Sequence, residues 1–184
     1  MEKSSNSIIK IAIIGPESTG KSSLAQALAA YYHEPWVPEI ARNYIANLNR
    51  PYHLKDISII AEMQLLEEIN KIQKAKKMLF CDTTLLVNKI WASFVFKEIP
   101  NNIIELYKPK DYQLHLLCNI DLPWENDPLR EHPNHRNELL ELYEDDLIKS
   151  QANYIKISGL KSDRLQNALE AITSFLMTEN NHLQ

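Results

Sequence analysis

Two alternating patterns of apolar residues run along the chain. Short continuous apolar runs, several of them rich in β-branched residues, are typical of strands that are buried on both faces. Longer segments in which apolar residues recur every three or four positions are typical of helices. The runs predict five strands, at residues 8–14, 35–38, 78–82, 112–120 and 154–158. The helical spacing predicts helices near residues 20–31, 40–48, 54–76, 85–96, 103–107, 136–149 and 165–175.

Strands and helices that alternate in this way form a parallel sheet with helices on both faces, which predicts an α/β fold. The length suits one domain over residues 1–184, with a core at about 8–176 and polar ends. Ligands of such sheets bind beyond the carboxyl ends of the strands. Residues that directly follow each predicted strand are therefore the first candidates for chemistry.

The turn after the first predicted strand carries the strongest functional signal. Residues 15–22 read Gly-Pro-Glu-Ser-Thr-Gly-Lys-Ser, which has the spacing G-x-x-x-x-G-K-[ST] of a phosphate-binding P-loop. The chain has only three glycines, and two of them stand in this motif. The apolar strand before the motif and the helical pattern after it are the context that a P-loop requires. The motif predicts a P-loop NTPase fold, a three-layer sandwich around a five-stranded parallel sheet.

The residue types of the motif suit the binding of ATP. Glycine lets backbone N–H groups converge on the phosphates, and the helix that begins near Gly20 adds its positive dipole end. Lys21 supplies a positive charge for the β- and γ-phosphates, and Ser22 offers a hydroxyl to Mg²⁺. Glu17, at the apex of the loop, faces either a second substrate or solvent. The predicted ATP-binding residues are Gly15, Glu17, Ser18, Thr19, Gly20, Lys21, Ser22 and Ser23.

Two carboxylates end predicted strands. Asp82 closes the third strand, the position from which P-loop enzymes hold Mg²⁺ opposite the loop hydroxyl. Its alternative role is to cap the next helix. Glu39 follows the second strand and is predicted to orient or deprotonate an acceptor hydroxyl, or else only to favour a helix dipole. Arg42 is a candidate substrate contact, or a partner of Glu39 one helical turn away.

Residues 121–135 contain three prolines and no periodicity, and an ordered loop of this length usually signals function. They are predicted to form a lid over the site. Arg130 could bring positive charge to the transition state of phosphoryl transfer. Trp124 could stack on a flat ring, and Asp127 is a further candidate substrate contact. The alternative is a solvated loop with surface salt bridges.

Composition restricts the partners. A net charge of −4 argues against non-specific binding to nucleic acid or to an anionic membrane. Cys81 and Cys118 lie in apolar strand-like runs, which is typical of buried thiols in a reduced protein. The polar start of the chain has no signal-peptide core, and no apolar run reaches membrane-spanning length. These features favour a cytoplasmic protein.

Taken together, the motifs resemble the ribosylnicotinamide kinase domain of the NadR family. The resemblance implies ATP- and Mg²⁺-dependent phosphorylation of the ribose 5′-hydroxyl of nicotinamide riboside, giving nicotinamide mononucleotide in NAD salvage. It adds Gln64 to the candidate substrate contacts. It covers Ile8 to about Phe175 and rests on the P-loop with its Glu-Ser pair, Glu39-x-x-Arg42-x-Tyr44, Ile60-Ala61-x-x-Gln64, Phe80-x-Asp82-Thr83 and Pro123-Trp124-x-x-Asp127-x-x-Arg130.

The chain departs from the family at one position, since Thr84 stands where the family often has a second acid. That difference bears on the acceptor and leaves the prediction of ATP binding unchanged. The chain also lacks the His-x-Gly-His signature of a nucleotidyltransferase, so adenylyl transfer is not expected.

Two other functions remain open from the sequence. The first is a P-loop kinase for another nucleoside or nucleotide, and the second is a regulatory module whose ATP state controls a partner. A GTPase is disfavoured, because residues 88–91 begin like the guanine-reading Asn-Lys-x-Asp but end without the aspartate. The expected ligands are therefore ATP and a small nucleoside-like acceptor.

Overall fold

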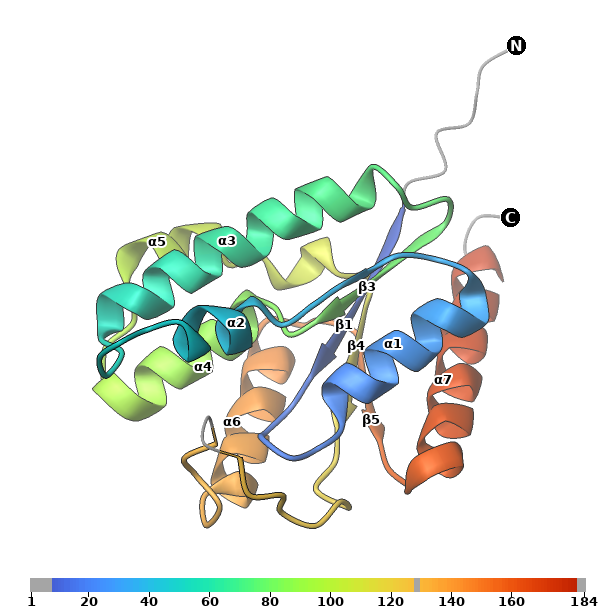
Figure 1. Cartoon of the computed structure of the whole chain (residues 1–184). Helices are drawn as coiled ribbons and strands as arrows, with labels where there is room; N and C mark the ends of the chain where they lie inside the picture. Colours follow the sequence, from blue (N-terminus) through green and yellow to red (C-terminus); the bar gives the residue numbers. More distant parts are fainter. Residues whose placement is uncertain (1–7, 128–129, 182–184) are drawn as a thin grey trace.

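A five-stranded parallel sheet forms the centre of the molecule (Figure 1). The computed structural model describes residues 8–127 and 130–181. The strands lie in the order β2-β3-β1-β4-β5. Their bounds are β1 Ile9–Ile14, β2 Trp36–Val37, β3 Met78–Asp82, β4 Leu114–Cys118 and β5 Tyr154–Ile157. The predicted fold class, an α/β sandwich around five parallel strands, is confirmed.

The helices cover both faces of this sheet. Their bounds are α1 Lys21–Tyr32, α2 Ile40–Ala46, α3 Leu54–Ile72, α4 Leu85–Phe96, α5 Asn101–Leu106, α6 Arg136–Lys149 and α7 Lys161–Asn181, with a short 3₁₀ helix, η1, at Pro109–Asp111. The prediction that the long third helix reaches residue 76 was wrong. It ends at Ile72, and the amides of Lys76 and Lys77 donate to the carboxylate of Glu34 at 2.9 and 2.8 Å.

The polar ends predicted from the sequence fall mainly on residues 1–7 and 182–184, which lie outside the described residues, as do residues 128 and 129 of the predicted lid. The described part of 121–135 contains neither helix nor strand. None of the helices within the described ranges is long and apolar enough to cross a membrane.

Successive residues of β1 face opposite layers, because side chains alternate along a strand. Ile11 and Ile13 pack in one core with residues of α1 and α7, and Ala12 and Ile14 pack in a second core with residues of α4 and α6. In Figure 1, α1 and α7 lie together on one side of the sheet. Cys81 and Cys118 are buried, free thiols in these two cores.

The strand register brings the predicted functional residues to one edge of the sheet. Ile13 of β1 lies opposite Asp82 of β3, and the amide of Thr83 donates to the carbonyl of Ile13 at 3.0 Å. Val37 of β2 lies opposite Cys81 on the other side of β3. The ends of β2, β3 and β1 therefore place the segment after Val37, Asp82 and the P-loop side by side.

Candidate functional site

The P-loop has a backbone that only glycine accommodates at two positions. Gly15 has φ +138°, and a Cβ there would lie 2.8 Å from the carbonyl oxygen of Cys118. Gly20 has φ +73°, and its Cβ would lie 2.8 Å from the side chain of Leu122, which belongs to the predicted lid. A side chain at Gly15 would displace the neighbouring strand backbone. The glycines of the motif are thus required by the close contact of β1, β4 and the lid.

Polar side chains of the loop fold back onto its own backbone. The hydroxyl of Thr19 and the ammonium group of Lys21 both donate to the carbonyl of Pro16, each at 2.8 Å. Ser22 and Ser23 lie in the first turn of α1, whose first N–H groups have no partner within the helix. This end of α1 combines unpaired donors, a helix dipole and a lysine charge, which suits a group of phosphates.

Two buried arginines, which the sequence did not indicate, bind the backbone of the loop. Arg136 donates to the carbonyls of Ser18 and Leu122 at 3.0 and 2.9 Å. Arg164 donates to the carbonyl of Thr19 at 2.8 Å. Burial lowers the pKa of Arg136, and the positive charge of Arg130 lowers it further. The two arginines thus satisfy the carbonyls of Ser18 and Thr19 and hold the backbone of the loop in place.

Asp82 lies at the end of β3 with 1 % of its surface exposed, and neither carboxylate oxygen has a hydrogen-bond partner among the described residues. Burial raises its pKa to about 6, the charge of Glu39 adds to the rise, and the nearby Ser22 hydroxyl and Lys21 oppose it. The predicted alternative, that Asp82 caps the next helix, fails because the cap position of α4 is Thr84 and the carboxylate accepts no bond.

Glu39 is fixed at the β2–α2 corner by a residue from another helix. The side chain of Gln64, on α3, accepts from the amide of Ile40 at 3.1 Å and donates to the carbonyl of Pro38 at 3.3 Å. Gln64 is 1 % exposed, so it holds the backbone on either side of Glu39. The Glu39 carboxylate makes no cap bond to α2 and lines the cavity.

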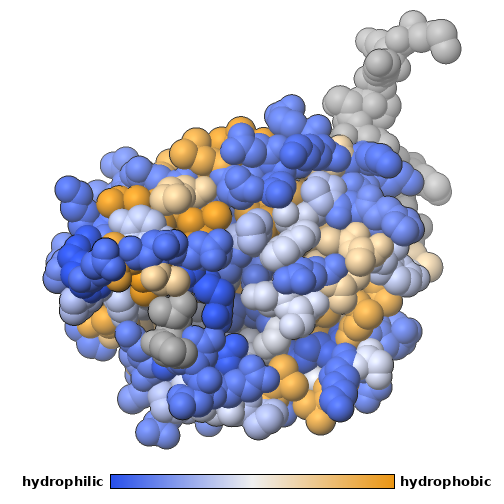
Figure 2. Space-filling model, in the orientation of Figure 1, coloured by the Kyte–Doolittle hydropathy of each residue, from blue (hydrophilic) through white to orange (hydrophobic). Residues whose placement is uncertain are grey.

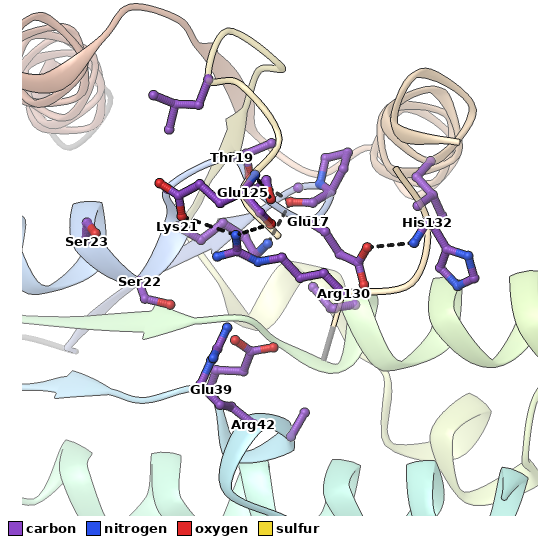
Figure 3. Close-up of a pocket in the computed structure, with 18 of the residues that line it drawn as sticks. Glu17, Thr19, Lys21, Ser22, Ser23, Glu39, Arg42, Glu125, Arg130 and His132 are labelled. Carbon is purple, nitrogen blue, oxygen red and sulfur yellow. Dashed lines mark hydrogen bonds and ion pairs between the residues drawn. The ribbon is translucent and has the colours of Figure 1, made fainter. Parts of the chain in front are cut away.

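The structure brings the predicted lid residues together with Arg42. Arg42 donates to Asp127, 85 residues away in the sequence, at 2.9 Å, and not to Glu39, which was the alternative to a substrate contact. Arg130 donates to the carbonyl and the carboxylate of Glu125 at 3.0 and 3.2 Å. Its guanidinium lines the cavity (Figure 3). Trp124 is half-buried and does not belong to the cavity lining, so the structure does not bring it to the other predicted residues.

One cavity of about 780 Å³ is lined by the P-loop, Glu39, Arg42 and Arg130, whereas Gln64, Asp82 and Asp127 do not belong to its lining. The P-loop forms its middle, with Glu39, Arg42 and Arg130 on one side and the first turn of α7 on the other. Figure 3 shows Glu39 and Arg42 pointing from the β2–α2 corner toward the loop. The face of the molecule in Figure 2 is largely hydrophilic, with hydrophobic side chains in separate patches, near α3 and on the side of α1 and α7.

The cavity also has an aromatic part, a feature that the sequence did not indicate. Its rings belong to Tyr52, Trp91, Phe94 and Tyr143. The Tyr52 and Trp91 rings meet edge to face at 5.0 Å, and the indole N–H donates to the Tyr52 hydroxyl at 3.2 Å. The Tyr52 hydroxyl in turn donates to Glu131 at 2.6 Å. In the sequence, Trp91 and Phe94 stand in a largely apolar helix and were indistinguishable from core residues.

Comparisons with known proteins support the fold. Residues 10–164 match the family model described as an AAA domain. The sequence comparison with curated proteins gives no match. A crystal structure of NadR in complex with NR is similar with a TM-score of 0.71 and 19% identity, over 91% of this chain and 49% of that chain. NadR in complex with NAD and AMP-PNP is similar with a TM-score of 0.70 and 18% identity, at the same coverage.

A thymidylate kinase from Ehrlichia chaffeensis also shares the fold, with a TM-score of 0.63 and 15% identity over 90% of this chain and 97% of that chain. The chain spans about half the length of the NadR structures that it matches. The predicted resemblance to the NadR kinase domain is confirmed at the level of the fold.

Proposed function

Since the chain belongs to the AAA-domain family, we propose that it is an ATP-dependent kinase that phosphorylates a small nucleoside, nicotinamide riboside in NAD salvage. One observation supports this above the others, namely the single cavity that joins a P-loop, a carboxylate at Glu39 and an aromatic part. A nucleotide cradle alone needs no second compartment. The kinase folds found in the comparisons, NadR and thymidylate kinase, agree with the proposal.

ATP lies with its phosphates on the P-loop and its base toward the first turn of α7, which also lines the cavity. The acceptor's ribose lies against Glu39 with its base in the aromatic part. The 5′-oxygen attacks the γ-phosphorus, the bond to the β–γ bridging oxygen breaks, and ADP leaves. Glu39 accepts the hydroxyl proton, while Lys21 and Arg130 neutralise charge on the transferring group.

The residues present fit a magnesium ion. Ser22 offers a hydroxyl at the start of α1, and Asp82 below it is a buried carboxylate with two unpartnered oxygens. Oxygen ligands of this kind are those that Mg²⁺ prefers, often through water. When bound, the ion neutralises charge on the β- and γ-phosphates.

The charges around the acceptor end favour a nucleoside over a nucleotide. Arg42 is paired with Asp127, and Arg50 makes two 2.8 Å bonds to Asp56, so neither arginine is left for an acceptor phosphate. Acidic Glu131 reaches the same end through Tyr52. Aromatic rings beside carboxylates suit a cationic ring such as the pyridinium of nicotinamide riboside.

The test is ADP release from ATP and Mg²⁺ with a panel of acceptors. Nicotinamide riboside should give one phosphorylated product per ADP, and benzamide riboside, its uncharged analogue, should react more slowly. Lys21→Ala provides the inactive control. Faster turnover with thymidine or a nucleoside monophosphate would replace the proposed acceptor. A rate of ADP release that is the same with and without each acceptor would favour the regulatory module.

A further inference from the structure

Glu17 stands in the P-loop but its carboxylate faces the lid. It accepts bonds from the backbone amide of Glu131, at 3.3 and 3.2 Å to its two oxygens, and from the amide of His132 at 3.1 Å (Figure 3). We propose that Glu17 is a positioning residue, which fixes the segment after Arg130 so that the arginine is held over the cavity. This inference rests on the proposed phosphoryl transfer.

The next loop residue holds the other side of the same arginine. The hydroxyl of Ser18 accepts from the amide of Glu125 at 3.3 Å, and Glu125 is the residue whose carbonyl and carboxylate bind the Arg130 guanidinium. Glu17 thus anchors the backbone directly after Arg130, and Ser18 anchors the partner of its side chain. The Glu-Ser pair of the motif therefore connects the phosphate loop to the lid at two points.

The anchored segment also reaches the acceptor end. Glu131, whose amide Glu17 binds, accepts the Tyr52 hydroxyl at 2.6 Å, and Tyr52 packs on Trp91. One chain of contacts consequently runs from the P-loop through the lid to the aromatic wall. Glu17 is linked to the aromatic wall only indirectly, since it bonds the backbone of Glu131 while Tyr52 bonds the Glu131 side chain, so its removal should affect Arg130 more than the binding of the nucleoside.

A negative charge at this place needs an explanation, since it lies in the loop that receives the phosphates of ATP. Two backbone amides on a carboxylate form charge-assisted hydrogen bonds, the stronger class. The nearby guanidinium of Arg136 compensates it further, since the charge of Glu17 partly opposes the lowering of the Arg136 pKa by burial and by Arg130. A glutamine would keep one oxygen acceptor and lose the charge, whereas an alanine would lose both.

Hydrogen exchange tests this role directly, using the full chain with Glu17→Ala and Glu17→Gln. The amides of Glu131 and His132 should exchange at least about tenfold faster in Glu17→Ala, because hydrogen bonds to a charged acceptor are strong. Glu17→Gln should be intermediate. Glu138→Ala, which removes an exposed partner of His135 at the end of the lid, is the matched control and should leave both amides unchanged.

Kinetics separates positioning from a direct contact with the second substrate. The positioning role predicts that kcat in Glu17→Ala falls while the KM of the nucleoside stays within about threefold, since only transition-state contacts are lost. A raised nucleoside KM with unchanged exchange would overturn the inference, as would unchanged exchange with unchanged kcat. If no acceptor reacts even with the wild type, the proposed function fails, and the exchange result still decides whether Glu17 anchors the lid.

Discussion

Replacing Asp82 by asparagine should stabilise the ligand-free protein at neutral pH. The carboxylate is buried and unpartnered, and burial raises its pKa to about 6, with Glu39 adding to the rise. An aspartate in the unfolded chain has a pKa of about 3.9. The folded state therefore binds more protons than the unfolded state between about pH 4 and pH 6, and stability falls as pH rises through this window.

The size of the effect follows from the two pKa values. A difference of about two pKa units corresponds to about 3 kcal/mol, which is the cost of the ionised group above pH 7. At about pH 5 the destabilisation is about half as large, because Asp82 is then mostly protonated in the folded protein and mostly ionised in the unfolded chain. For a chain of this length, 3 kcal/mol corresponds to a rise in Tm of about 6–12 °C.

Thermal unfolding without nucleotide or Mg²⁺ at pH 8 and pH 5 measures this difference. Asp82→Asn should unfold at the higher temperature at pH 8, and the gap should narrow to about half at pH 5. The buried amide adds a penalty that does not depend on pH, so the narrowing is the decisive quantity. A difference in Tm between the variant and the wild type that is the same at pH 8 and pH 5 would refute the reasoning.

Asp56→Asn is the matched control, because Asp56 is equally buried but fully bonded. Its carboxylate accepts from Arg50, from Tyr44 at 2.9 Å and from the amide of His53 at 2.7 Å. The bonds from Arg50 hold the pKa of Asp56 well below its usual range. A lowered pKa contributes stability that is lost as pH falls, so Asp56→Asn should destabilise the protein at pH 8.

Three further substitutions test separate parts of the site. Arg130→Ala should lower kcat by about 10³ or more with little change in the KM of ATP, as for arginines that act on transferring phosphates; an unchanged kcat, measured by ADP release, would leave Arg130 a surface-loop residue. Trp91→Ala should raise the nucleoside KM about tenfold, since stacking on a base is worth about 1–3 kcal/mol, and Trp91→Phe should recover most of it; equal KM values would exclude stacking. Gln64→Leu should reduce kcat and leave the KM of ATP unchanged, because it frees the backbone that holds Glu39; loss of ATP binding instead would indicate general unfolding.

Much of the fold could be predicted because its signals are local. The bounds of β3 predicted from its apolar run are those observed, and so are the bounds of α4 and α6 predicted from helical spacing. The P-loop is contiguous in sequence, so its type could be recognised without knowing what packs against it. The strand ends then indicated Glu39 and Asp82, since all parallel strands present their carboxyl ends at one edge.

The rest of the site depends on contacts between distant residues. Arg136 lies 118 residues from the Ser18 carbonyl that it binds, and Arg164 lies 145 residues from Thr19. Gln64 was predicted as a substrate contact, and only the structure shows that it bonds the backbone around Glu39. The residue types at these positions do not indicate their partners, because an arginine or a glutamine on a helix is most often exposed to solvent.

The three carboxylates of the site differ in what satisfies their charge, and this difference indicates where a cation should act. The carboxylate of Glu17 accepts hydrogen bonds from two backbone amides, and Glu39 lines the open cavity, where water reaches it. Asp82 alone of the three is both buried and without a hydrogen-bond partner. A bound Mg²⁺ would remove that cost, so Mg²⁺ with ATP should raise the Tm of the wild type more than that of Asp82→Asn. Equal shifts in both proteins would mean that ATP binds without help from Asp82. The destabilisation of the ligand-free protein and the proposed role in metal binding therefore have one cause, namely that the ionised carboxylate of Asp82 is buried away from water.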